Sequence, residues 1–164
     1  MATESENFDE ICPDCGALVP GGRNGCRKLF DEVLAKEFSD YKYAREHRLT
    51  VDIYSLQHPS DYMQSPKSYA AHLTGLYAAM KCDSSPAINQ AMQQWLSTNP
   101  KNLERPDDPV PRKRGVLTIA YLHEAEGPDE HVRRVREWAD STWDAWRDYS
   151  EFAKQWILAA SNRK

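Results

Sequence analysis

The chain has 164 residues, a formal net charge of −4 and a sequence isoelectric point near 5.7. These values argue against a broad nucleic-acid-binding surface, because such a surface needs an excess of basic residues. No apolar run approaches the ~20 residues that a membrane-spanning helix requires, and the acidic N-terminus lacks the hydrophobic segment of a signal peptide. We therefore expect a single cytoplasmic domain of ordinary globular composition.

The first 26 residues divide into an acidic lead and a segment of turn-forming residues. Residues 1–10 predict a disordered lead. Residues 11–26 hold three cysteines among prolines and glycines, a composition typical of loops rather than of helices or strands. We expect this segment to form a zinc knuckle, a compact metal-binding turn.

Apolar residues then recur with helical spacing. Residues 26–38 predict an amphipathic helix, and residues 43–57 predict a second helix that is unusually apolar. Residues 51–54 also have strand propensity, because β-branched and aromatic side chains cluster there. The helix is the preferred interpretation, since it extends the apolar period across the whole segment.

Two further helices carry clear start signals. Ser65 followed by Pro66 is a typical helix N-terminus, which predicts a third helix over residues 65–82. A fourth helix is expected to begin at Pro86 and to continue to about Leu96. Both segments place apolar side chains on one face.

The second half of the chain begins with a predicted loop. Residues 98–114 contain four prolines and many charges, which predicts a long exposed connection. A short apolar element is expected over residues 116–124, and a last helix from Gly127-Pro128 to about Ala160. Together the elements predict a mainly α, single-domain helical bundle with an N-terminal cysteine-rich zinc knuckle.

Five stretches of the sequence resemble an uncharacterised bacterial family of unknown function. They are CPDCG, GCRKLFDEVLAKEFSD, HRLTVDIYSLQHP, SYAAHLTGLYAAM and REWADSTWDAWRDY. The resemblance covers residues 11 to 157 and is most specific in HRLTVDIYSLQHP. It implies an organisation and the location of a site, but no reaction. The resemblance also implies a histidine pair where this chain has Tyr149-Ser150, so a function that needs that pair is not expected here.

Three of the four cysteines lie close together near the N-terminus. Cys12 and Cys15 form a C-x-x-C pair followed directly by glycine, and Cys26 adds a third thiol. Zinc prefers thiolate and imidazole ligands in a tetrahedral shell, and glycine permits the tight turn that aims two sulfurs at one point. A redox pair lacks its usual βαβ context here, and a reducing cytoplasm disfavours a disulfide. The sequence favours zinc and leaves redox-active thiols and a disulfide as alternatives.

The fourth ligand has to come from another segment. The candidates are His47, His58, His72 and Cys82. If the helices over residues 26–38 and 43–57 form an antiparallel hairpin, Cys26 and His58 lie at the same end of it. His47 precedes His58 by eleven residues, or roughly 16 Å along a helix, so one ion cannot bind both. We therefore predict a structural zinc held by Cys12, Cys15, Cys26 and His58.

A second polar group is predicted on the helices that follow. If the chain turns back near residue 62, Asp52 faces His72, and a carboxylate on an imidazole fixes its tautomer and raises its basicity. Tyr69, one turn before His72, would add a hydroxyl, and His47 would be a further polar group or a metal ligand. The functional interpretation is the pocket of a small enzyme. The structural interpretation is a buried polar pair that sets helix register.

Several other charged side chains are expected at the surface. Arg45 and Arg48 flank His47, where they would either bind an anionic substrate or, as we expect, pair with carboxylates. The carboxylates expected to pair with them are Glu37, Asp40 and Glu46. His123 and His131 have charged neighbours in the sequence and are expected to be solvent-exposed.

Tryptophans are concentrated on the last predicted helix. They are Trp138, Trp143, Trp146 and Trp156. Aromatic residues at helical spacing usually belong to the core. These four occupy two stripes, which is more than one helix face usually buries, so one stripe is expected to face a pocket or to form a homodimer contact.

The sequence thus favours a zinc-binding helical protein that acts as a binding or regulatory module for an unknown small molecule or protein. The alternative is a small metal- or acid/base-dependent hydrolase or transferase with a pocket around Asp52, His72 and His47. No P-loop, nucleotide-binding fingerprint or HExxH motif is present to identify a reaction.

Overall fold

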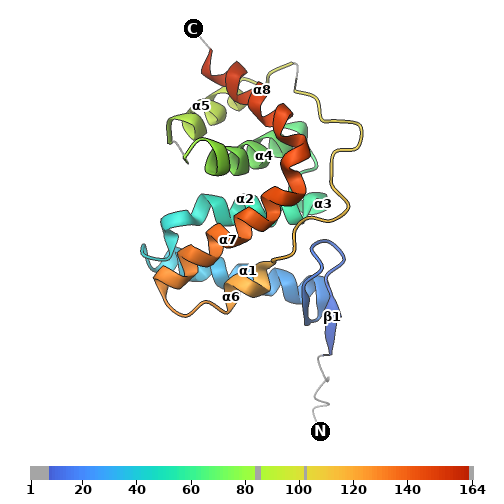
Figure 1. The fold of residues 1–164 in the computed structure, drawn as a ribbon, viewed down its shortest axis with the longest axis vertical. Helices are drawn as coiled ribbons and strands as arrows, with labels where there is room; N and C mark the ends of the chain where they lie inside the picture. Colours follow the sequence, from blue (N-terminus) through green and yellow to red (C-terminus); the bar gives the residue numbers. More distant parts are fainter. Residues whose placement is uncertain (1–7, 84–85, 102, 163–164) are drawn as a thin grey trace.

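The computed structural model describes residues 8–83, 86–101 and 103–162, and it confirms the predicted mainly α class (Figure 1). Eight α-helices are present in these residues: α1 (Gly22–Ser39), α2 (His47–Gln57), α3 (Pro59–Tyr62), α4 (Pro66–Lys81), α5 (Pro86–Ser97), α6 (Ile119–His123), α7 (Pro128–Trp146) and α8 (Ser150–Ser161). Two short 3₁₀ turns, η1 (Ala44–Glu46) and η2 (Arg147–Tyr149), precede α2 and α8.

The cysteine-rich segment differs from the predicted loop, because it contains a small hairpin. Strand β1 (Asp9–Ile11) pairs antiparallel with β2 (Leu18–Pro20). Between them, Cys12 N donates to Ala17 O at 2.8 Å, which closes a tight turn. Asp9 and Glu10 therefore belong to a strand rather than to the predicted lead, whose residues 1–7 lie outside the described part of the chain.

Helix α1 begins four residues earlier than the sequence predicts, at Gly22 instead of Cys26. A close approach between the hairpin and the helix explains the glycine in its first turn. A Cβ on Gly25 would lie only 1.8 Å from the carbonyl oxygen of Pro20. The absence of a side chain at Gly25 therefore allows β2 to pack directly on α1.

The segment with strand propensity is helical and lies at the centre of the fold. Helix α2 packs against α4 and α7, and its residues from Asp52 to Gln57 are all buried. Burial on several sides explains why the buried residues of this segment surround the helix rather than follow one stripe. The predicted start of α4 is also confirmed, since the Ser65 side chain accepts a hydrogen bond from Ser68 N at 3.0 Å.

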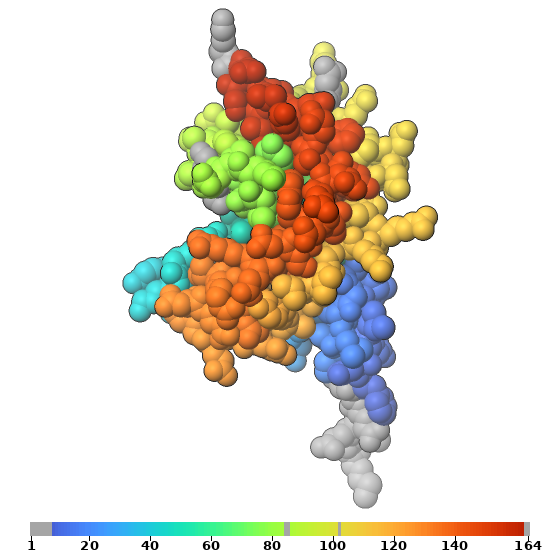
Figure 2. Space-filling model, in the orientation of Figure 1, coloured from blue at the N-terminus to red at the C-terminus, as the bar shows by residue number. Residues whose placement is uncertain are grey.

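The helices are arranged along the long axis of the molecule (Figure 1). The hairpin, α1 and α6 lie toward one end, α2 and α7 cross the middle, and α4, α5 and α8 lie toward the other end (Figure 1). The space-filling view shows the same order, from the blue N-terminal segment to the green and red helices (Figure 2). One continuous hydrophobic core runs through all of these layers.

The predicted proline-rich loop lacks regular structure but is held against the helices. Apart from residue 102, which is not described, residues 98–118 form neither helix nor strand. Tyr69 and Tyr149 donate hydrogen bonds to the carbonyl oxygens of Pro109 and Asp108, at 2.7 and 3.0 Å. These bonds fix the middle of the connection.

The last predicted helix is interrupted at Trp146. Helix α7 ends there, η2 forms one 3₁₀ turn, and α8 continues from Ser150. The interruption has no proline or glycine as its cause. It allows α7 to pack against α2 and α6 while α8 packs against α4 and α5, so tertiary contacts decide the break.

Most of the tryptophan cluster lies in the core. Trp138 and Trp146 are fully buried and Trp156 is nearly so. Trp143 stays half-buried and contacts the edge of Tyr77, with ring centroids 6.0 Å apart. The expected pocket or homodimer contact on this helix stays a prediction, and Trp143 is the one of the four indoles that remains partly accessible for it.

Candidate metal centre and helical cleft

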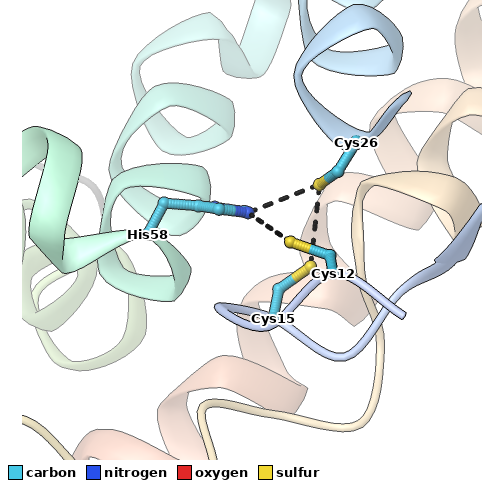
Figure 3. Close-up of side chains that lie close together, drawn as sticks. All are labelled: Cys12, Cys15, Cys26 and His58. Atoms are coloured by element: carbon cyan, nitrogen blue, oxygen red, sulfur yellow. Dashed lines mark hydrogen bonds between the residues drawn. The ribbon is translucent and has the colours of Figure 1, made fainter. Parts of the chain in front are cut away.

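Three thiols and one imidazole meet where the hairpin contacts α1 and α2 (Figure 3). Cys12 and Cys15 come from the hairpin turn, Cys26 from α1, and His58 from the residue that follows α2. One ligand atom of each lies within 4.8 Å of all the others, and all four residues are buried. The four side chains that the sequence analysis selected therefore do lie together.

Three of the distances between these atoms are close to those in a tetrahedral metal shell. His58 Nε2 lies 3.7 Å from Cys12 Sγ and 3.4 Å from Cys26 Sγ, and Cys15 Sγ lies 3.7 Å from Cys26 Sγ. A tetrahedron with metal–sulfur bonds of about 2.3 Å has edges of about 3.8 Å. All three cysteines are free thiols, so the structure contains none of the disulfides that the sequence left open.

The imidazole of His58 is fixed in the orientation that a metal needs. Its Nδ1 lies 2.8 Å from the carbonyl oxygen of Tyr54, an acceptor that requires the proton on Nδ1. Nε2 then presents its lone pair to the thiols, as in metal sites where a backbone carbonyl orients the ligand. The ring also stacks on Tyr54, which stacks in turn on Phe30, with centroid distances of 3.8 and 3.7 Å.

Two of the three thiols have a raised pKa when no cation is near them. Burial raises the pKa of the Cys12 thiol above its ordinary value of 9.0. A hydrogen bond with Cys26, together with burial, raises the pKa of Cys15 to about 12. A divalent cation reverses this effect, because it stabilises thiolates at short range. The group is therefore compatible with metal binding.

The other candidates for the fourth ligand lie elsewhere. Cys82 follows α4 and His72 lies within it. His47, at the start of α2, bonds through Nδ1 to Glu37 Oε2 at 2.7 Å. The antiparallel arrangement of α1 and α2 thus brings His58, and not His47, to the thiols.

Asp52 and His72 face one another across the contact between α2 and α4, as predicted. His72 Nδ1 lies 2.8 Å from Asp52 Oδ1, and Arg48 Nε donates to Asp52 Oδ2 at 3.1 Å. Asp52 is 1% exposed. A Cβ on Gly75 would lie 1.9 Å from Asp52 Oδ2, so glycine at this position of α4 leaves the space that the carboxylate fills.

The Asp52–His72 pair borders an open cleft. A cavity of about 560 Å³ lies between α2, α4 and α5, and both residues contribute to its wall. The side chain of His72 keeps 19% of its surface exposed. Hence the carboxylate is buried while the imidazole remains accessible, which is an arrangement that an acid/base site requires.

Tyr69 does not join this pair. It is fully buried, and its hydroxyl donates to Pro109 O. Burial raises the pKa of this phenol. Tyr69 instead contacts Trp146 and Trp156 edge-on, with centroid distances of 6.1 and 6.0 Å. Its position indicates a role in anchoring the 98–118 segment.

A buried carboxylate that the sequence analysis missed holds two histidines. Glu37, 2% exposed, accepts hydrogen bonds from Thr50 and from both His47 and His131, at distances of 2.7 to 2.8 Å. The prediction that His131 is solvent-exposed is wrong, since it is 1% exposed. His131 shares one face of α7 with Val135 and Trp138, and that face turns inward even though the neighbours in sequence are charged.

A signal for Glu37 is present in the sequence. The buried residues of α1 are Gly22, Cys26, Phe30, Val33 and Glu37, which recur at helical spacing. A carboxylate on an otherwise apolar stripe has to find partners, and polar residues of other helices supply them here. The stripe therefore indicates a buried acid, although not its partners.

The remaining charged side chains agree partly with expectation. His123 is partly exposed and bonds to Glu32 Oε2 at 2.6 Å. Arg45 and Arg48 do pair with carboxylates, but not with the three that the sequence suggested. Arg45 pairs with the distant Asp129 at 2.7 Å, and Arg48 pairs with Asp52 at 3.1 Å. Among the described helices, none has the length and apolar character needed to cross a membrane.

Comparison with known proteins connects the chain to one family. The profile of a family of unknown function, DUF5946, matches residues 10–147. No curated protein and no solved structure matches the chain. The matched residues include all four members of the Cys₃His group and the Asp52–His72 pair. This chain therefore belongs to the family of unknown function DUF5946.

Proposed function

We propose that the protein is a helical binding module whose N-terminal hairpin is fixed by one structural zinc ion. The proposal rests on the four buried ligand atoms that lie within 4.8 Å of one another. Thiolate and imidazole ligands favour zinc over magnesium or calcium. Four protein ligands close the tetrahedral shell, which is typical of a structural rather than a catalytic zinc.

The position of the Cys₃His group supports a structural role. The hairpin is short, with three residues in each strand, and an isolated hairpin of this size is marginal in water. A metal bound to Cys12, Cys15, Cys26 and His58 would join the hairpin to α1 and to the end of α2. Its binding free energy would then contribute directly to folding.

The test is the metal content per chain, measured by mass spectrometry on protein purified without chelator. We expect about one zinc per chain, because a closed four-ligand shell holds one ion. His58→Ala should lose the metal. His47→Ala is the matched control, since it removes a histidine from the other end of α2 and should retain the zinc. Retention in His58→Ala, or loss in His47→Ala alone, would contradict the proposed ligand set.

A small acid/base enzyme is the second candidate, and the Asp52–His72 pair at the cleft favours it. Asp52 holds the Nδ1 proton of His72, which leaves Nε2 as the basic nitrogen toward a substrate. Hydrolysis or group transfer is the reaction class that such a pair serves. Tyr69 has no part in this candidate because its hydroxyl is bound to the loop, whereas His47 lines a smaller cavity of about 260 Å³ that Arg48 and Asp52 also border.

Hydrolysis of p-nitrophenyl butyrate provides a first assay for this candidate. Asp52→Asn and His72→Gln should each lower the rate by at least about 100-fold, within the range expected for loss of a general base. Asp144→Asn, an exposed change on α7, should not alter it. Thermal unfolding of each variant separates loss of catalysis from loss of fold. Equal rates in all three variants would exclude the pair as the catalytic group.

A further inference from the structure

We propose that the cleft between α2, α4 and α5 binds a small organic anion with an apolar body, of the kind represented by a medium-chain carboxylate. This inference deepens the second candidate function, because it names the ligand class for the same cleft. It requires no catalysis, however, and it holds equally for a binding module.

The charges that line the cleft are predominantly positive. Its two cationic side chains are Arg48 from α2 and Lys67 from α4. Asp52 is the one acid in the lining, and both of its oxygens are already bound, one to Arg48 and one to His72. The cleft therefore offers an unbalanced positive charge within a chain whose net charge is −4.

Arg48 has the geometry of a carboxylate receptor. Its Nε is used by Asp52, and no other hydrogen bond of its guanidinium is present in the described part of the chain. The terminal nitrogens can therefore form the paired hydrogen bonds that a carboxylate accepts from arginine. The bond to Asp52 fixes the guanidinium in place, which lowers the entropy lost when a ligand binds.

Lys67 lies near the mouth of the same cleft. Its Nζ donates to Asn99 Oδ1 at 2.7 Å, which holds the lysine over the start of α4. A lysine acts as a point charge that attracts an anion without imposing a direction. Arg48 would then orient the anionic group, and Lys67 would add to its attraction.

Part of the cleft lining is apolar. Val51 from α2 and Met92 and Leu96 from α5 contribute to it. Met92 and Leu96 are 2% and 6% exposed, so they are held by the core and form a firm surface. The cavity volume of about 560 Å³ is within the range of small-molecule sites. An anionic head with an apolar tail matches both the cationic and the apolar residues of the lining, whereas a small inorganic anion would contact only the cationic residues.

Calorimetric titration of the zinc-loaded full chain tests this inference, with octanoate, octanamide and acetate as the probes. Octanoate should bind at least about tenfold more tightly than octanamide, because the amide lacks the charge that pairs with Arg48. Octanoate should also bind at least about tenfold more tightly than acetate, because acetate buries almost no apolar surface. Equal affinities for octanoate and octanamide, equal affinities for octanoate and acetate, or no heat of binding with octanoate would each overturn the inference.

Two matched pairs of variants locate the binding site. Arg48→Gln and Lys67→Gln should weaken octanoate binding, the first by about tenfold or more and the second by a smaller factor. Arg112→Gln and Lys101→Gln change exposed residues outside the cleft lining and should leave the affinity unchanged. Lys67→Gln changes only an exposed side chain, so its result holds even if Arg48→Gln alters the fold. Unchanged affinity in both cleft variants would place the ligand elsewhere.

The two proposals fail in different ways. Octanoate binding with no hydrolysis of p-nitrophenyl butyrate would support the ligand class and exclude the tested enzyme activity. Hydrolysis that depends on Asp52, combined with equal affinity for octanoate and octanamide, would support the enzyme and overturn the ligand class. Zinc content, measured on the same samples, reports separately on the metal centre.

Discussion

Cys12 and Cys15 show how strongly the pKa of a buried thiol depends on its surroundings. Both have raised pKa values, Cys12 because of burial and Cys15 because of its hydrogen bond with Cys26 together with burial. At neutral pH these thiols therefore carry their protons when no cation is bound. The proposed metal would have to displace those protons, since the thiolate is the form that binds.

This coupling predicts that zinc affinity rises steeply with pH. Each thiol proton released changes the affinity roughly tenfold per pH unit below the pKa of that thiol, so Cys12 and Cys15 alone contribute about 100-fold. The pKa of Cys15 is about 12. Raising the pH removes protons that compete with the metal, so binding should tighten. Competition with a chromogenic chelator across a pH series, corrected for the chelator's own titration, measures the slope. An affinity independent of pH would show that the thiols are already ionised or are not ligands.

Contacts between elements explain features that no single residue accounts for. Helices α2 and α4 approach so closely at Gly75 that the Asp52 carboxylate occupies the place of a side chain. The same carboxylate bonds to Arg48 and His72. The packing of these two helices and the shape of the cleft are therefore determined by the same contact.

Gly75→Ala should consequently lower stability by about 1–3 kcal/mol, as is typical when a well-packed site is overfilled. The new Cβ would meet Asp52 Oδ2 at 1.9 Å, so the carboxylate would have to move from the position in which it bonds Arg48 and His72. Denaturant unfolding of the full chain measures the loss. The double variant with Asp52→Ala removes the clash. Its loss in the free energy of unfolding should therefore be smaller than the sum of the losses in the two single variants. Strict additivity would show that Gly75 is not constrained by Asp52.

For the whole molecule, one buried carboxylate joins distant parts of the chain. Glu37 lies near the end of α1, and its hydrogen-bond donors lie on α2 and α7. Buried carboxylates are rare unless their oxygens are paired. Glu37 meets this condition with three donors, so it fixes how α1, α2 and α7 are placed relative to one another.

Glu37→Ala should lower the free energy of unfolding by about 3 kcal/mol or more, because it leaves the buried His131 without its acceptor. Glu32→Ala is the matched control on the same helix. Glu32 pairs with the partly exposed His123, and such surface pairs contribute less than about 1 kcal/mol. Chemical denaturation of both variants provides the comparison. A cost for Glu37→Ala no larger than that for Glu32→Ala would contradict the structural role of the network.

Local chemistry made much of the structure predictable from the sequence. Apolar periodicity placed α1, α2, α4 and α5, and the Ser65-Pro66 signal placed the start of α4 to within a residue. The meeting of His58 with the three thiols followed from metal-ligand chemistry and from the direction in which two consecutive helices run. The Asp52–His72 contact followed in the same way from one reversal of the chain. Each of these conclusions needed only neighbouring segments.

Tertiary structure alone decided the features that depend on distant segments. The β1–β2 hairpin is too short to have a periodic signal and depends on its packing against Gly25. His131 has a charged local sequence, yet it is buried because α7 brings it to Glu37, 94 residues earlier in the chain. The cleft similarly requires α5 to lie beside α2 and α4, an arrangement that no local pattern specifies. Periodicity reports which face of a helix is buried, whereas the partner of that face is set by packing of the whole chain.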